Sequence, residues 1–271
     1  MNENVINVPL NELYNFPNHP FIVEDDEKMD NLVTSIKSQG VIIPGIVRKR
    51  KEGGYEIISG HRRKRACERA GLETMPVVVN DVNDDEATVI MVDSNIQREE
   101  LRPSERAYAY SMKFTARKHQ GVKGGNTLEE IAEIFGDSVK TVQRYINLAS
   151  LSKNLLEYID CKKITIKAGD ELSYTKPNEQ LWIEEIMNGY KVKVAEKKAK
   201  SIKKLSQEGK LTKELVLKIL TEEKKSSNYI KIEKDLIDSY FSPSSSDEDK
   251  KETILNLLDN WAKNNRMGMC G

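Results

Sequence analysis

The chain has 271 residues, enough for more than one domain, and its 38% hydrophobic and 32% charged residues are typical of helix-rich, water-exposed domains. No apolar run approaches the roughly 20 residues that span a bilayer, and the N-terminus lacks a secretory pattern, so we expect neither a membrane protein nor a secreted one. The three cysteines, Cys67, Cys161 and Cys270, form no zinc spacing and no disulfide framework, which favours the reducing cytoplasm.

The net charge of zero hides an uneven distribution of charged residues. Residues 1–100 contain 12 basic and 18 acidic side chains, whereas residues 113–225 contain 23 basic and 16 acidic ones. A basic middle segment is expected where one part of a chain meets a polyanion, but also where lysine-rich helices are simply solvated. Charge alone leaves both interpretations open.

The first hundred residues alternate between strand and helix patterns, which predicts a compact mixed α/β domain. Apolar residues recur at strand or helix spacing, and glycines mark several element ends. The predicted elements are a strand at 5–10, a helix ending at Gly40, strands at 46–49 and 55–58 around Gly53 and Gly54, a helix at 61–70, a strand at 77–79 and a helix from 84.

The sequence SGHRRKRA at residues 59–66 joins a predicted strand to an arginine-rich helix. The start of a helix has unpaired backbone N–H groups and the positive end of the helix dipole, so a glycine followed by Arg62 and Arg63 suits a polyphosphate. The GxxxxGK[ST] loop of common NTPases does not occur in the chain. Alternatively, Arg62, Arg65 and Arg69 form one solvated helix face, because they follow the spacing i, i+3, i+7.

After Arg102 the strand patterns fade and helical patterns follow. Pro103 suits the first turn of a helix that we expect to run to about His119. Glycines then predict a flexible break before the next helix. These glycines are Gly121, Gly124 and Gly125.

Residues 127–145 carry the pattern of a helix-turn-helix. Thr127 and Glu130 have the spacing of a capping box at the start of its first helix. A small residue, the turn glycine Gly136 and several apolar residues fall where the motif needs them, although an ordinary helical hairpin would share part of this pattern. The second helix begins near Ser138 and offers side chains that suit base edges and phosphates. The predicted DNA contacts are Ser138, Lys140, Thr141, Gln143 and Arg144.

The C-terminal part has a different composition. A lysine- and serine-rich linker at residues 224–228 precedes an apolar run, and the following SPSSSDEDK at residues 242–250 reads as disordered. The last predicted element is an amphipathic helix, and we expect it to self-associate or to cap the helical domain. It carries Ile254, Leu257, Leu258 and Trp261. The expected domains are residues 1–100, 101–225 and 226–271.

In this order the motifs resemble those of ParB-type partition proteins (ParB/RepB/Noc-like), the DNA-binding components of plasmid and chromosome segregation systems. The resemblance covers about residues 5–225, and the C-terminal part resembles variants from plasmids and integrative elements. It implies an α+β fold: a small mixed α/β ParB/sulfiredoxin-like domain, an all-α helix-turn-helix domain and a short C-terminal helical segment. The matching segments are HPF at 19–21, SIKSQGVIIP at 35–44, SGHRRKRA at 59–66, SNIQREELRPSERA at 94–107 and KITIKAGDELSYTKPNEQ at 163–180.

The resemblance also implies a function. The N-terminal domain would bind CTP with Mg²⁺, and the nucleotide would control closure of a dimeric clamp around double-stranded DNA at a centromere-like site. The implied partners are a second copy of the chain and a ParA-type ATPase, on the nucleoid in the cytoplasm and without a membrane. The nucleotide-binding residues carried over are Gly60, His61, Arg62, Arg63, Asn95, Gln97 and Arg98, and Asn95 would also bind the metal.

Three positions depart from the family's pattern. His61 stands where a glutamate is common, and Ile43 replaces a frequent glutamine near the base. Ser94 replaces the acidic residue that is tied to metal binding and hydrolysis, and a serine hydroxyl is a poor general base near neutral pH. Asp93 points about 100° away from Ser94 around a helix. We therefore expect nucleotide binding with weak or absent hydrolysis, and we assign no catalytic residue.

Two alternative functions stay open. A transcriptional or replication regulator would use the same helix-turn-helix without nucleotide switching. An enzyme of the superfamily would be a nucleotide hydrolase or a nuclease, but the histidines His19, His61 and His119 are scattered along the chain. Sulfiredoxin chemistry is not expected, because it needs a cysteine at the position of His61, and Cys67 lies nearly two helical turns further on.

Overall fold

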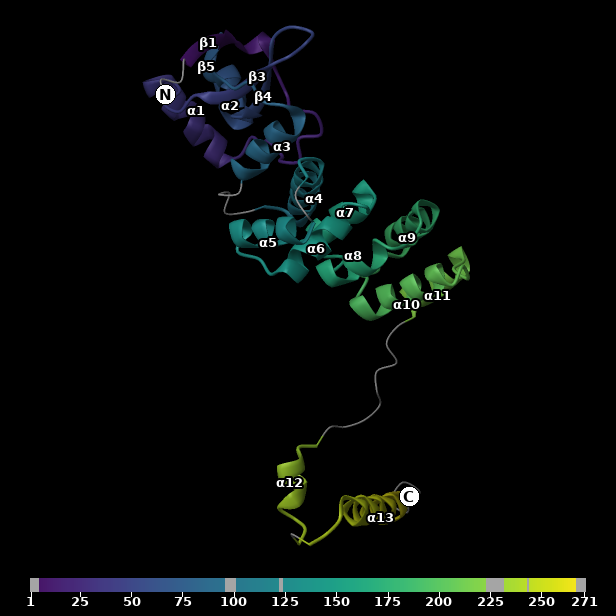
Figure 1. Cartoon of the computed structure of the whole chain (residues 1–271). Helices are drawn as coiled ribbons and strands as arrows, with labels where there is room; N and C mark the ends of the chain where they lie inside the picture. Colours follow the sequence, from purple (N-terminus) through teal and green to yellow (C-terminus); the bar gives the residue numbers. More distant parts are fainter. Residues whose placement is uncertain (1–4, 96–100, 122–123, 223–231, 243, 267–271) are drawn as a thin grey trace. The chain divides into compact units, whose positions relative to one another are not determined.

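The computed structural model of the chain describes residues 5–95, 101–121, 124–222, 232–242 and 244–266. The chain forms two compact units, Met1–Glu222 and Glu223–Gly271, which are considered separately (Figure 1). No helix in the described residues is long and apolar enough to cross a bilayer.

A five-stranded mixed sheet forms the centre of the N-terminal part. Its strands are β1 (Val5–Pro9), β2 (Leu13–Tyr14), β3 (Gly45–Lys49), β4 (Tyr55–Ser59) and β5 (Thr74–Val79). Their order in the sheet is β1-β5-β3-β4-β2. The β1–β5 and β3–β4 pairs are antiparallel, and the β3–β5 and β2–β4 pairs are parallel. The antiparallel β3–β4 pair confirms the predicted hairpin.

Buried side chains cover both faces of this sheet. The helices here are α1 (Glu27–Gln39), α2 (His61–Ala70) and α3 (Asp84–Asp93), and η1 (Leu10–Glu12) is a single 3₁₀ turn. Successive strand residues point to opposite faces. Val47 and Ile57 therefore lie in a buried cluster with residues of α1 and α2, whereas Ile58 lies in a second cluster with residues of α3. The sheet thus has a helical layer on each face, and the predicted mixed α/β domain is confirmed.

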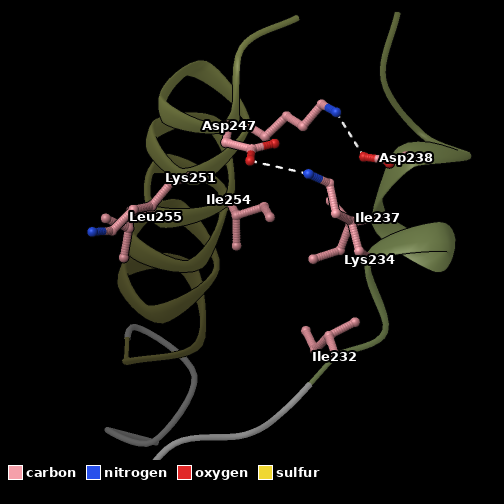
Figure 2. Close-up of a pocket in the computed structure, with 9 residues that line it drawn as sticks. Ile232, Lys234, Ile237, Asp238, Asp247, Lys251, Ile254 and Leu255 are labelled. Atoms are coloured by element: carbon pink, nitrogen blue, oxygen red, sulfur yellow. Dashed lines mark hydrogen bonds and ion pairs between the residues drawn. The ribbon is translucent and has the colours of Figure 1, made fainter. Parts of the chain in front are cut away.

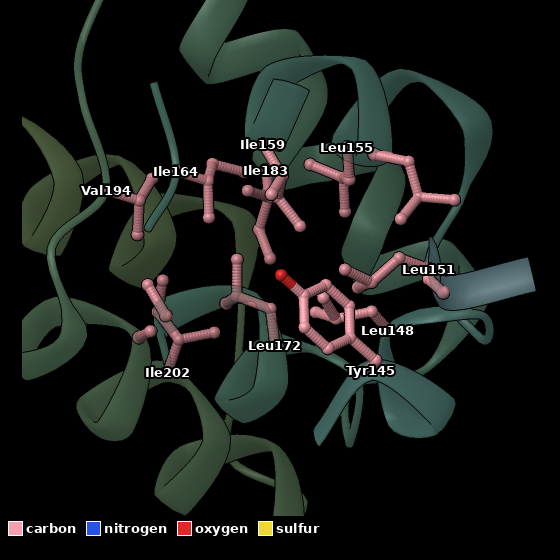
Figure 3. Close-up of a cluster of buried hydrophobic side chains, with 14 of the residues drawn as sticks. Tyr145, Leu148, Leu151, Leu155, Ile159, Ile164, Leu172, Ile183, Val194 and Ile202 are labelled. Atoms are coloured by element: carbon pink, nitrogen blue, oxygen red, sulfur yellow. The ribbon is translucent and has the colours of Figure 1, made fainter. Parts of the chain in front are cut away.

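The second half of this unit consists of helices joined by short loops, with one isolated β-bridge between Ile164 and Val194 in its described residues. Its helices are α4 (Pro103–His119), α5 (Gly124–Phe135), α6 (Val139–Leu148), α7 (Lys153–Asp160), α8 (Ile166–Leu172), α9 (Pro177–Tyr190), α10 (Glu196–Gln207) and α11 (Lys213–Thr221). They enclose one apolar core, in which Leu148, Leu155 and Ile183 converge (Figure 3). α4 belongs to both halves, because Ala109 packs in the α3 cluster while Tyr110 packs in the helical core.

The predicted capping box at Thr127 and Glu130 is wrong. α5 begins earlier, at Gly124, so Gly124 and Gly125 are helical and do not form the predicted break. Thr127 is buried inside the helix, and the Glu130 carboxylate binds Arg117 of α4 at 2.9 Å. Both glycines lie in the first turn of α5, where a glycine costs less than in a helix interior.

The second unit contains α12 (Lys234–Asp238) and α13 (Asp247–Arg266). Two ion pairs join them, Lys234–Asp247 at 3.1 Å and Lys250–Asp238 at 2.6 Å, beside an apolar groove (Figure 2). The predicted amphipathic helix is confirmed. The prediction of disorder is wrong for residues 247–250, because they form the first turn of α13. Acidic side chains in a first turn interact favourably with the helix dipole, and Asp249 accepts a hydrogen bond from the Ser246 hydroxyl.

Candidate functional site

The arginine helix α2 begins directly where strand β4 ends. Gly60 is its N-cap, with φ +117°, and a Cβ at this position would lie 3.2 Å from the Cα of Gly45. A glycine is therefore required for the chain to turn from strand to helix so close to β3. The first backbone N–H groups of α2 lack intrahelical partners, so the structure confirms the predicted helix start, and anion binding at this turn stays a prediction.

The arginine side chains of α2 bind acidic residues at the start of α1. Arg62 contacts Asp26 at 2.8 Å, and Arg65 contacts Asp25 at 2.6 Å. Arg69 also reaches Asp25, at 3.5 Å. The hydrogen bonds from Arg65 and Arg62 lower the pKa of Asp25 and of Asp26, respectively. The helix face that carries Arg62, Arg65 and Arg69 therefore contacts the start of α1 through ion pairs. The alternative interpretation from the sequence was a face that contacts only water.

Arg63 holds a loop of the same domain. Its guanidinium donates to the backbone carbonyls of Ile43 and Pro44, at 2.7 and 2.5 Å, and lies 3.4 Å from the Ser59 hydroxyl. Burial lowers the pKa of Arg63. Its contacts connect the motif at residues 59–66 with the loop in which Ile43 departs from the family's pattern, so this arginine also has a structural task.

His61 is buried, and its contacts are to the N-terminal part of the chain. Its ring lies 3.8 Å from that of His19, centroid to centroid, and its Nε2 accepts a hydrogen bond from the Phe16 backbone N–H at 3.4 Å. Cys67, on the same helix, is buried as well, and burial raises the pKa of its thiol. The structure thus gives His61 a packing role next to the predicted phosphate site.

The second predicted motif follows α3. The Asn95 side-chain N–H donates to the Met91 carbonyl at 2.8 Å, and the Ser94 hydroxyl donates to the same carbonyl at 3.0 Å. Met91 lies in the same buried cluster as Ile58, which precedes Gly60 by two residues. One cluster therefore connects the two motifs, although they are far apart in the sequence. Gln97 and Arg98 lie outside the described residues.

Asp93, the acidic residue next to Ser94, is engaged in an ion pair. Its carboxylate binds Lys113 of α4 at 2.6 Å, and the Lys113 side chain is 0% exposed. The same ammonium group lies 3.4 Å from Glu130 of α5. A buried lysine therefore links α3, α4 and α5, and the sequence alone did not indicate this link.

The helix-turn-helix consists of α5, a short turn and α6. Gly136 has φ +66°, the left-handed conformation that suits a turn glycine, and Ser138 caps α6 by accepting a hydrogen bond from the Thr141 N–H at 3.2 Å. In the turn, the Asp137 carboxylate accepts a hydrogen bond from the Tyr110 hydroxyl of α4 at 2.5 Å. The turn is thus anchored to α4, and the predicted start of the second helix is confirmed.

The side chains predicted to contact DNA differ in their exposure to solvent. Lys140 and Gln143 are exposed on α6, and the Gln143 amide donates to Asn147 at 3.0 Å. The Arg144 Nε contacts Asp170 of α8 at 3.3 Å, and only 19% of the Arg144 side chain is exposed. The surface of α6 that is open to a ligand is therefore centred on Lys140 and Gln143.

Comparison with known proteins places both halves of the first unit in one family. Residues 1–96 match the ParB N-terminal domain, and residues 99–204 match the ParB HTH domain. The chain is 33% identical over 194 residues to the chromosome-partitioning protein Spo0J of Thermus thermophilus, covering 71% of this chain and 69% of that one. It is 32% identical over 203 residues to the nucleoid occlusion protein of Halalkalibacterium halodurans, covering 74% and 69%.

One solved structure is also similar to this chain, at a lower sequence identity than these two relatives. It is the C-terminally truncated chromosome-partitioning protein ParB from Caulobacter crescentus complexed to the centromeric parS site. It is 23% identical and has a TM-score of 0.42, and the match covers 75% of this chain and 99% of that one.

Replacing Gly60 by alanine should destabilise the protein by about 1–3 kcal/mol, because a φ of +117° strains any residue with a Cβ. The matched control is Gly189→Ala in α9, where an added Cβ meets nothing within 4 Å and the change should be neutral or stabilising by up to about 1 kcal/mol. Urea unfolding measures both. Equal stabilities of the two variants would contradict the strained turn.

Proposed function

Because the chain belongs to the ParB family, we propose that it is a partition protein that binds a centromere-like DNA site and closes on DNA as a CTP-gated dimeric clamp. Its similarity to a chromosome-partitioning protein and to a nucleoid occlusion protein supports a role on the nucleoid. The observation that carries the proposal is the pairing, in one unit, of an arginine-rich helix start with a capped helix-turn-helix.

In this proposal the start of α2 binds the triphosphate of CTP. The backbone N–H groups after Gly60 and the guanidinium groups of Arg62 and Arg63 supply hydrogen-bond donors and positive charge. Gln97 and Arg98 are carried over from the family to the same phosphate-facing segment. Ile43, in the loop that Arg63 holds, stands where the family often has a glutamine near the base.

The proposed magnesium site has one protein ligand, the side-chain oxygen of Asn95. The Asn95 amide nitrogen already donates to Met91, and this bond directs the oxygen away from that carbonyl. Asp93 is bound to Lys113, and no group of three His, Cys, Asp or Glu side chains suited to a metal occurs in the described residues. Phosphate oxygens and water would supply the other ligands of Mg²⁺. With Ser94 in place of an acid, we propose nucleotide binding with little turnover.

α6 is the proposed recognition helix. Lys140 and Gln143 are exposed on it and suit phosphates and base edges. Ser138 caps its N-terminal end, the end that enters the major groove in this motif, and accepts a hydrogen bond from the Thr141 N–H. The excess of basic residues in residues 113–225 would add contacts to the DNA backbone.

We place dimerisation in the second unit. α13 leaves a set of large apolar side chains more than half exposed, more than a unit of this size normally leaves in water. A second copy of the chain would cover them. The ParA-type ATPase and a plasmid or integrative-element host belong to the proposal through the family alone. The apolar side chains are Leu255, Leu257, Leu258 and Trp261.

Replacing Arg62 by glutamine should weaken CTP binding in the presence of Mg²⁺ by about tenfold or more, because a charge-assisted contact to phosphate is lost. Isothermal titration calorimetry measures the affinity. Arg69→Gln is the matched control: Arg69 lies on the same helix, bound to Asp30 at 2.7 Å, and its loss should leave CTP affinity unchanged. If the two variants bound CTP equally well, Arg62 would not belong to the site.

Replacing Gln143 by alanine should reduce the discrimination between the target site and random DNA by about 1–3 kcal/mol, since a base contact is lost. Gln207→Ala, an exposed glutamine at the end of α10, is the control and should keep the parental discrimination. Footprinting identifies the site, and fluorescence anisotropy on site and random duplexes measures the ratio. A parental ratio for Gln143→Ala would remove α6 as the recognition helix.

A further inference from the structure

A short acidic segment, residues 24–26, lies between the arginine helix and the first DNA-domain helix. On one side, Asp26 binds Arg62 at 2.8 Å and Asp25 binds Arg65 at 2.6 Å. The guanidinium groups of Arg62 and Arg65 are therefore already bound to anions, and these anions come from the chain itself. A carboxylate and a phosphate use the same N–H donors of an arginine, so the two cannot occupy one donor together.

On its other side, the same stretch of chain is bound to α4. The Ile22 backbone N–H donates to the Glu105 carboxylate at 2.7 Å, and Glu105 is only 5% exposed. The second oxygen of that carboxylate accepts a hydrogen bond from the Arg102 N–H at 2.9 Å, at the start of α4. Arg102 in turn forms an ion pair with Glu24. Residues 22–26 thus connect α2 with the helix that anchors the helix-turn-helix.

The acidic contacts are of a kind that a nucleotide can displace. In the Arg62–Asp26 pair the two side chains are 26% and 38% exposed, and in the Arg65–Asp25 pair they are 45% and 43% exposed. Ion pairs that water reaches contribute little to stability, whereas a triphosphate offers several charged oxygens at once. Asp26 also caps α1 through the Met29 N–H at 2.8 Å, so the segment has a defined position to which it returns.

We propose that the acidic segment at residues 24–26 is an internal competitor of the nucleotide: its Asp25 and Asp26 occupy Arg65 and Arg62 of α2, and a polyphosphate binds these arginines only by displacing the two carboxylates. The inference rests on the proposed CTP site at Gly60 and Arg62. Because Ile22 and Glu24 bind the start of α4, displacement of the segment also breaks or shifts its contacts with the DNA-binding half. The acidic segment is therefore the part of the chain through which nucleotide binding at α2 affects α4.

The test is the CTP affinity of the full chain carrying Asp25→Asn and Asp26→Asn. Asparagine keeps the cap of α1, because it is as good an N-cap as aspartate, but it does not neutralise an arginine. The control carries Glu27→Gln and Asp30→Asn, which changes the net charge equally and leaves the Arg62–Asp26 and Arg65–Asp25 pairs in place. Calorimetry with CTP and Mg²⁺ is done on the parent and both double variants.

The Asp25→Asn/Asp26→Asn variant should bind CTP about three- to tenfold more tightly than the control variant. A shift no larger than the control's, or weaker binding, while the parent binds CTP, overturns the competitor and leaves the proposed function standing. Binding by this variant alone, with none by the parent, supports the competitor in its strongest form. If no protein of the three binds CTP, the nucleotide site itself fails, and the competitor fails with it.

Discussion

In the N-terminal domain, ion pairs fix how the arginines of α2 lie against the start of α1, although strands β3 and β4 separate these two helices in the sequence. Arg62 and Arg65 of α2 bind Asp26 and Asp25 at the start of α1. Their positions follow from the turn at Gly60, which directs α2 back across the sheet beside β3. The same contacts hold the chain between β2 and α1 in place, so the geometry of the predicted phosphate site and the path of that loop cannot change independently.

α4 transmits this arrangement to the helical half of the unit. Near its start, Glu105 binds the backbone of Ile22, and further along, the buried Lys113 bridges Asp93 of α3 and Glu130 of α5. Lys113 lies in a dry environment, where removing either partner of an ion pair costs more than it does at the surface. A rearrangement at the end of α3 therefore changes the support of α5, the first helix of the helix-turn-helix.

Local signals in the sequence were sufficient for most of the fold. The hairpin at β3–β4, the extents of α2 and α4 and the turn at Gly136 follow from glycine, proline and apolar spacing, which act over a few residues. The start of α5 did not follow, because Glu130 is held by Arg117 of another helix and does not cap its own.

For the candidate site, the sequence predicted where some of its residues lie in helices and turns, but not which side chains they contact. The sequence placed Gly60 at a helix start, and the structure confirms it. The partners Asp26 for Arg62 and Asp170 for Arg144 come from distant segments, and no spacing rule relates them. Pairing across an element boundary depends on packing, so the sequence showed cationic side chains without showing that the chain already neutralises them.

The most direct test is hydrogen–deuterium exchange at single amides, followed by NMR, with and without CTP and Mg²⁺. If nucleotide displaces the acidic segment, the Ile22 amide, bound to Glu105, should exchange faster when CTP is present, while exchange of the Ile57 amide in the core of β4 should be unchanged. Slower or unchanged exchange at Ile22 under conditions where CTP is bound would contradict it, because the acidic segment would then stay in place beside the nucleotide.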